Sequence, residues 1–132
     1  MIKERKKLSL LSSVLLILLS ISIAVAGQLM LKIGIDRIGV NGFGSMKALV
    51  SLFSGIIRSP MVLAGLFLYF ISAAIWLVIL STVDLSFAYP FIGLSYVLVL
   101  VLSRFILKEE VNPIRWIGAF IITAGVVIIS RG

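Results

Sequence analysis

Two polar side chains near the end of the first long apolar run are the first candidates for chemistry. Gln28 and Lys32 are four residues apart, so in a helix they lie one turn apart on the same face. An ammonium such as that of Lys32 can hold a phosphate as a point charge. If the run crosses a membrane, Lys32 can instead extend to the lipid–water boundary and act only as an anchor. Both interpretations stay open from these residues alone.

A second group of candidates lies in the third apolar run. Tyr89 and Tyr96 are seven residues apart and share a helix face, with Pro90 and Gly93 nearby. Pro90 predicts a kink, because it frees a backbone carbonyl, and broken membrane helices tend to line cavities. Arg104, two turns beyond Tyr96, suits a bidentate grip on a phosphate. Without the kink, the tyrosines would be expected simply to pack.

The residue types that are missing exclude several kinds of site. The chain has no cysteine, no histidine and five acidic residues. Disulfides and thiolate metal sites are therefore impossible, and the commonest general base is absent. We expect no metal, no cofactor and no enzyme activity. The first run also holds no carboxylate, which a proton-coupled cation exporter usually needs at mid-membrane.

The elements that must position these residues are membrane helices. Of the 132 residues, 61% are hydrophobic and 13% charged, and the mean hydropathy is +1.27. A soluble domain of this size cannot hide so much apolar surface, so the excess must face lipid. The basic N-terminus mimics a signal peptide, but the apolar run after it is too long for one. The fold class predicted is an all-α integral membrane protein, one domain over residues 1–132, with spans at about 8–34, 60–83, 85–107 and 112–130.

The connection between the first two spans contains an apolar pattern of its own. Apolar residues recur at helical spacing between Met46 and Ile57, and the intervening positions hold serine, Lys47 and Arg58. This pattern predicts a short amphipathic helix over about 45–58 that lies in the membrane interface.

The charge distribution indicates lipid rather than nucleic acid. The net charge is +7, but the basic residues sit at the ends of apolar runs, as expected for headgroup anchors. Four spans put both termini on one side, with five basic residues there and seven on the other. This near balance leaves the N-terminus inside, outside, or in both orientations.

Small residues in the fourth run predict a helix–helix contact. Gly118 and Gly125 are seven residues apart on one face, flanked by Ala119 and Ala124. Small side chains allow two membrane helices to approach closely. We expect this face to be the contact of a homodimer, or of a heterodimer with a paralogue.

Taken together, these motifs resemble a known family. The Ala88-Tyr89-Pro90 run, the Glu109 and Pro113 connection and the later glycines are similar to the EamA module of the drug/metabolite transporter superfamily. Among its four-helix members, the chain most resembles the flippase subunits for undecaprenyl phosphate-aminoarabinose, through residues 25–29 with Lys32, and 76–80. Against the small multidrug resistance exporters, Ala24 stands where their essential glutamate would be. The resemblance covers about residues 14–34 and 60–130 and fails over 35–59, where this chain is longer.

The resemblance implies a transporter of the inner membrane that moves a polyprenyl phosphate-linked sugar lipid or another amphiphile. The expected substrate-binding residues are Gln28, Lys32, Tyr89, Tyr96, Arg104 and Glu109. Two alternatives stay open: a small multidrug, cation or metabolite exporter, and a non-transporting partner of a membrane glycosyltransferase.

Overall fold

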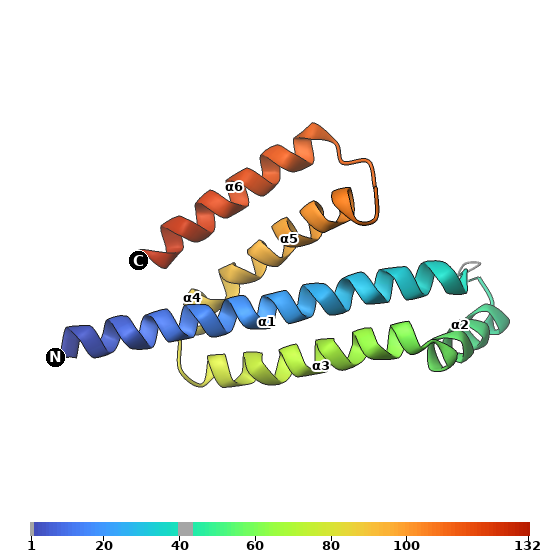
Figure 1. Cartoon of the computed structure of the whole chain (residues 1–132), viewed down its shortest axis with the longest axis horizontal. Helices are drawn as coiled ribbons and strands as arrows, with labels where there is room; N and C mark the ends of the chain where they lie inside the picture. The colour runs from blue at the N-terminus through green and yellow to red at the C-terminus, as the bar shows by residue number, and fades with distance from the viewer. Residues whose placement is uncertain (1, 40–43) are drawn as a thin grey trace.

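The chain folds into helices throughout the part that the structure describes. The structure is a computed structural model that describes residues 2–39 and 44–132, with side chains from residue 10 onward. Its elements are α1 (Ile2–Ile38), α2 (Met46–Arg58), α3 (Pro60–Leu80), α4 (Leu85–Ala88), the 3-10 helix η1 (Tyr89–Phe91), α5 (Ile92–Phe105) and α6 (Pro113–Ser130) (Figure 1). Four segments are long and apolar enough to cross a membrane: Leu10–Ile38, Pro60–Leu80, Leu85–Phe105 and Pro113–Ser130. The predicted all-α, four-span membrane architecture is confirmed.

Two of the spans begin at a capping residue followed by proline. The Ser59 hydroxyl accepts a hydrogen bond from the Val62 N–H at 3.3 Å, and Pro60 begins α3. The Asn112 side chain accepts one from the Ile114 N–H at 3.0 Å, at the start of α6. Each cap satisfies a free N–H of the first turn, and proline has no N–H to leave unpaired there.

Helix α1 is longer at its C-terminus than the sequence indicated. It continues to Ile38, beyond the expected end near residue 34. Gly34 lies within the helix and packs closely against α3, since a Cβ at that position would run into Val62. This packing supports the helix beyond Gly34. Lys32 therefore lies inside α1, more than a turn before its end.

Helices α1 and α3 form the central antiparallel pair of the molecule (Figure 1). At their closest approach Gly27 faces Gly65: a Cβ on Gly27 would lie 2.8 Å from the Gly65 carbonyl oxygen. Ser20 and Ser72 also join the two helices by reciprocal buried bonds. The Ser20 hydroxyl donates to the Ser72 carbonyl at 3.0 Å, and the Ser72 hydroxyl donates to the Ser20 carbonyl at 2.8 Å. Small residues and hydroxyls thus fix the pairing, as in other membrane bundles.

The third span is not one continuous α-helix. It begins as α4, changes to the 3-10 turn η1 around Pro90, and continues as α5. The core of the molecule gathers at this break, from all four spans. It consists of Ile17, Ile21, Val25, Ile79, Ala88, Phe91 and Val126.

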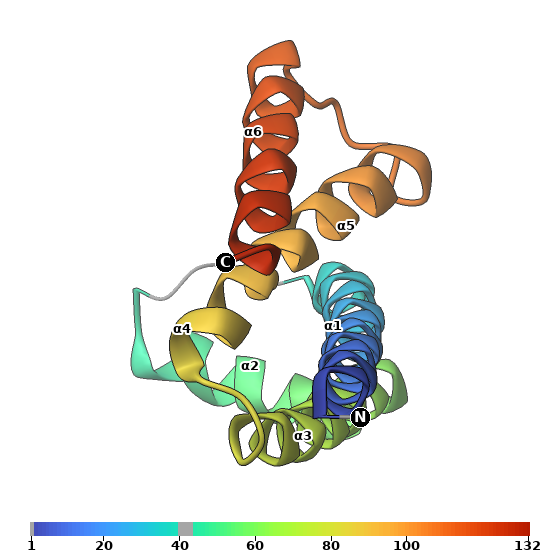
Figure 2. The same ribbon diagram turned by 90° about the vertical axis from the view of Figure 1, so that its left-hand side faces the viewer.

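Helix α6 packs mainly against α5 and η1, and stands apart from the α1–α3 pair (Figure 2). Gly93 of α5 makes room for this contact, since a Cβ there would lie 2.9 Å from Ile122 of α6. By contrast, a Cβ on Gly118 or Gly125 would meet no atom within 4 Å. The glycine face of α6 is therefore not used for packing within the described chain, and the expected dimer contact stays a prediction.

Candidate functional site

Two adjoining pockets, together called the crevice, lie between α1 and α5; α3 completes the inner one, and the loop after α5 completes the outer one. The inner pocket has a volume of about 240 Å³, and the outer pocket about 220 Å³. Val25, Gln28 and Val99 line both pockets, so the two pockets are direct neighbours. Each is smaller than the ~300–1,000 Å³ of a typical small-molecule site, so a head group of sugar size would need both.

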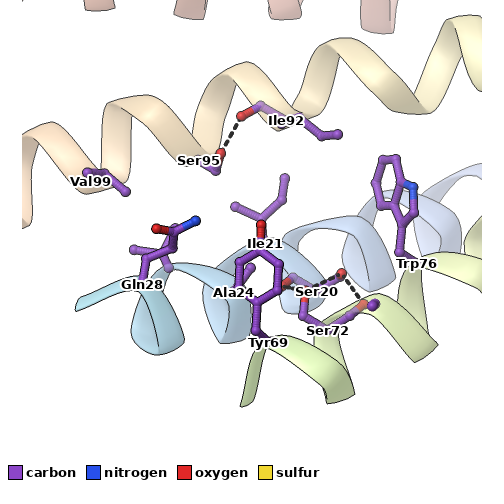
Figure 3. Close-up of a pocket in the computed structure, with 12 residues that line it drawn as sticks. Ser20, Ile21, Ala24, Gln28, Tyr69, Ser72, Trp76, Ile92, Ser95 and Val99 are labelled. Atoms are coloured by element: carbon purple, nitrogen blue, oxygen red, sulfur yellow. Dashed lines mark hydrogen bonds between the residues drawn. The ribbon is translucent and has the colours of Figure 1, made fainter. Parts of the chain in front are cut away.

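The inner pocket is apolar with a few hydroxyl and ring groups. Figure 3 shows α5 on one side, with Ser95 and Val99, and α1 and α3 on the other, with Gln28 and Trp76. The remaining lining residues are Ser20, Ile21, Ala24, Val25, Tyr69, Ser72, Ala73 and Ile92.

The serines of the inner pocket are already hydrogen-bonded, whereas Gln28 is not. Ser20 and Ser72 bond to each other's helix, and the Ser95 hydroxyl donates to the Ile92 carbonyl. Among the described residues, the Gln28 amide has no hydrogen-bond partner, and it is exposed to the crevice. Its two donors and one acceptor group are thus available to a ligand where the two pockets meet.

The outer pocket carries the charges. Lys32 and Glu109 line it, together with Leu29, Leu102, Ser103 and Leu107. The Lys32 ammonium lies 3.1 Å from a carboxylate oxygen of Asp36, one turn further along α1. The two side chains are 52% and 58% exposed, so this pair is solvent-accessible. Such a pair contributes little stability, and Lys32 can leave Asp36 at small cost.

A wide turn after α5 brings Glu109 to the crevice. Lys108 has a φ of 56°, in the left-handed region that side chains other than glycine seldom adopt. This conformation reverses the chain, and the Glu109 N–H donates to the Ser103 carbonyl at 3.0 Å. Since Ser103 also lines the outer pocket, Glu109 is held beside it, whereas Glu110 is not among the lining residues.

The sequence candidates divide into two sets. Gln28 and Lys32 of α1 and Glu109 of the loop after α5 come together in the crevice. Tyr89, Tyr96 and Arg104 line neither pocket, and all three are exposed. A role for these three in substrate binding stays a prediction.

Several residues of the crevice were not singled out as candidates in the sequence. Tyr69, Ser72 and Trp76 of α3 line the inner pocket, and Asp36 holds Lys32. An i, i+4 pair of opposite charges is a detectable signal for Asp36, but it requires α1 to continue beyond residue 34. No signal marks Ser72, because nothing in a uniformly apolar helix shows which face packs.

The described part of the chain offers no group of three or more His, Cys, Asp or Glu side chains that could hold a metal ion. The crevice combines an apolar interior with one amide (Gln28), one ammonium (Lys32) and one carboxylate (Glu109). These groups suit an amphiphile with a polar, charged head.

Several known proteins are similar to the chain. The chain is similar to a probable 4-amino-4-deoxy-L-arabinose-phosphoundecaprenol flippase subunit of Pseudomonas savastanoi pv. phaseolicola, with 39% identity over 43% of this chain and 50% of the relative. Proteins of the same description in two strains of Pseudomonas fluorescens are 31% identical over 56% of the chain and 65% of the relative (Pf0-1), and 25% identical over 90% of the chain and 97% of the relative (Pf-5). The chain thus spans only half to two thirds of the length of the first two. No solved structure gives a significant match.

The comparison that covers most of the chain is the one with models of protein families. The pattern of the EamA-like transporter family matches residues 10–131, which is nearly the whole chain. The resemblance found in the sequence is confirmed, and with it the assignment as a multi-pass protein of the inner membrane. The chain belongs to the EamA-like transporter family.

Proposed function

We propose that the chain is a subunit of a flippase that moves a polyprenyl phosphate-linked sugar lipid across the membrane. The observation that carries this proposal is the crevice, which changes from apolar to charged at Gln28. An amphiphile placed there would put its head group between Lys32 and Gln28. Its tail would extend into the surrounding lipid, because the crevice has no room for a long chain.

Lys32 is the residue proposed to hold the phosphate. A phosphate diester carries one negative charge, and moving a bare charge to the bilayer centre costs at least ~2.5–3.5 kcal/mol on insertion scales. A neighbouring ammonium lowers that cost. The four-carbon stem of Lys32 allows it to leave Asp36 and follow the phosphate along the crevice.

Glu109 is proposed to recognise a positive charge on the sugar. The relatives are named for a lipid whose sugar carries an amino group, and such an amine is protonated near pH 7. Glu109 and Lys32 line the same outer pocket. One cation and one anion side by side match a head group that carries both an ammonium and a phosphate. Gln28, between them and the inner pocket, can bond the sugar hydroxyls.

Translocation by the purified protein tests this proposal. The protein is reconstituted in liposomes with a polyprenyl phosphate-amino sugar, and the lipid that reaches the outer leaflet is measured. Lys32→Gln should lower the rate at least tenfold, with normal expression. Arg115→Gln removes the same charge outside the crevice and should change the rate less than twofold. Normal translocation in Lys32→Gln would show that Lys32 is only an anchor and would refute its proposed role.

A second pair of variants tests recognition of the amine. Glu109→Gln should slow the amino sugar lipid and leave a lipid with an uncharged sugar unchanged. Glu110→Gln is the matched control, since Glu110 does not line the crevice. If the wild-type protein moves neither lipid on its own, the chain is no autonomous flippase, and the alternative of a partner to a membrane glycosyltransferase gains support.

A further inference from the structure

Helix α2 presents three distinct faces around its axis. One face packs on the protein: Ala48, Leu49, Leu52, Gly55 and Ile56 are half-buried. A second face is apolar and open, and a third holds Lys47, Ser51, Ser54 and Arg58. These faces follow one another around the helix at 100° per residue. A helix inside a protein core would have no polar face, and a helix packed on a protein in water would have no open apolar face.

The packed face fixes α2 against the rest of the chain. A Cβ on Gly55 would lie 2.8 Å from Ile38 at the end of α1, so the two helices are in close contact. The Ser45 hydroxyl caps the helix start by accepting from the Ala48 N–H at 3.2 Å. Ser59 both ends α2 and caps α3, so no linker separates the helix from the second span. The orientation of α2 is therefore set by the fold.

The open face is a continuous apolar stripe. Met46, Val50, Phe53 and Ile57 are spaced by three or four residues and are 78%, 63%, 62% and 70% exposed. Leu63 and Phe67 of the adjacent span α3 are exposed as well. An exposed apolar stripe on a helix that joins a membrane span directly is expected to be covered by lipid.

The polar face carries positive charge alone. Lys47 and Arg58 lie on it, eleven residues and about 16 Å apart along the axis. Residues 44–59 contain no acidic side chain. Basic residues beside an inserted apolar stripe are placed to meet anionic lipid headgroups.

We propose that α2 is a lipid-binding element, which inserts its apolar stripe into the membrane surface and binds anionic phospholipid through Lys47 and Arg58. Helix α2 lies at the same end of the bundle as the turn that carries Glu109 (Figure 1). Anionic lipid gathered by α2 would thus lie at the same end of the bundle as the charged mouth of the crevice. This inference does not depend on which lipid the crevice moves.

Single cysteines can measure the depth of each face, because the chain has none of its own. Phe53→Cys places an environment-sensitive fluorophore on the apolar stripe, and Ser51→Cys places the same fluorophore on the polar face as the matched control. The full-length protein is reconstituted in phosphatidylcholine vesicles. The label at residue 53 should emit at shorter wavelength and be quenched by lipids with a spin label on the acyl chain. The label at residue 51 should show neither effect. Equal emission from the two positions would overturn the proposed insertion, and would leave the stripe for a protein partner.

The same label tests the charge preference. Its quenching by headgroup-spin-labelled phosphatidylglycerol is compared with that by the phosphatidylcholine analogue. The preference for the anionic lipid should fall roughly fivefold for each basic residue removed, in Lys47→Gln and Arg58→Gln, and should weaken at high salt. Arg115→Gln, on α6, should leave it unchanged. A preference that survives the Lys47→Gln/Arg58→Gln double variant would refute the role given to these residues.

Discussion

Removing the carboxylate of Asp36 should tighten the binding of a phosphate to the crevice. In the structure Asp36 lies 3.1 Å from the Lys32 ammonium, so a phosphate must compete with it for the same cation. Both side chains are more than half exposed. Helical i, i+4 pairs of this kind are worth ~0.3–0.5 kcal/mol, and exposed pairs in general up to ~1 kcal/mol. Releasing Lys32 by Asp36→Asn should therefore lower the Kd for a polyprenyl phosphate by about two- to fivefold.

Trp76 supplies the assay, because it lines the inner pocket. In a Trp116→Phe background it is the single tryptophan, and its fluorescence can be titrated with a polyprenyl phosphate. Asp84→Asn removes an equal charge from the turn before α4, away from the crevice, and should not change the Kd. Lys32→Gln should raise the Kd at least tenfold, since a hydrogen bond between charged groups is lost.

The double variant Lys32→Gln/Asp36→Asn is the strictest part of this test. If Asp36 acts by holding Lys32, then Asp36→Asn should have no effect once Lys32 is glutamine. An equal gain in affinity in both backgrounds would mean that Asp36 acts only through general charge. Weaker binding in Asp36→Asn would mean that the pair orients Lys32 for the phosphate, which contradicts the competition argued above.

Three further predictions concern packing, assembly and substrate class. Gly27→Ala should lower the free energy of unfolding by ~1–3 kcal/mol, because its methyl group would press on the Gly65 carbonyl; Gly125→Ala, which meets open space, should not, when both are measured in micelles that hold one chain each. Gly118→Leu combined with Gly125→Leu should shift a dimer to monomer in detergent by light scattering, and a wild-type monomer in lipid nanodiscs would contradict the proposed contact. Expression in an exporter-deficient strain should not raise ethidium resistance, since Ala24 offers the inner pocket no carboxylate; a clear gain would favour the cation exporter.

The architecture was predictable because the membrane imposes it. Apolar length alone locates the four spans, and Pro60 and Pro113 mark two of the starts. The 3.6-residue period of α2 also appears in the sequence, because that helix has a polar side. Within the spans this signal is absent. Lipid and protein are equally apolar neighbours, so the sequence does not show that Ser20 faces Ser72.

The site was predictable in part, and the features that the sequence did not predict depend on local backbone conformation. Lys32 and Gln28 share a helix, so their proximity follows from spacing alone. The place of Glu109 depends on the left-handed conformation of Lys108, which no glycine signals. The common face expected for Tyr89 and Tyr96 assumed a regular α-helix. The structure has a 3-10 turn at residues 89–91, and the common face of the two tyrosines stays a prediction.

The location of the core has a consequence for transport. The charged end of the crevice, with Lys32, lies near the C-terminal end of α1. A separate open pocket, with Asp84, lies at the α3–α4 turn at the other end. Between them the buried cluster that includes Ile17, Ile79 and Phe91 joins all four spans. A charged head group cannot cross this dry layer without a large desolvation cost. If the chain moves a charged head group as proposed, we therefore expect α5 and α6 to shift relative to the α1–α3 pair at this layer. The 3-10 turn η1, where the third span departs from α-helical geometry, is the hinge we propose for that shift.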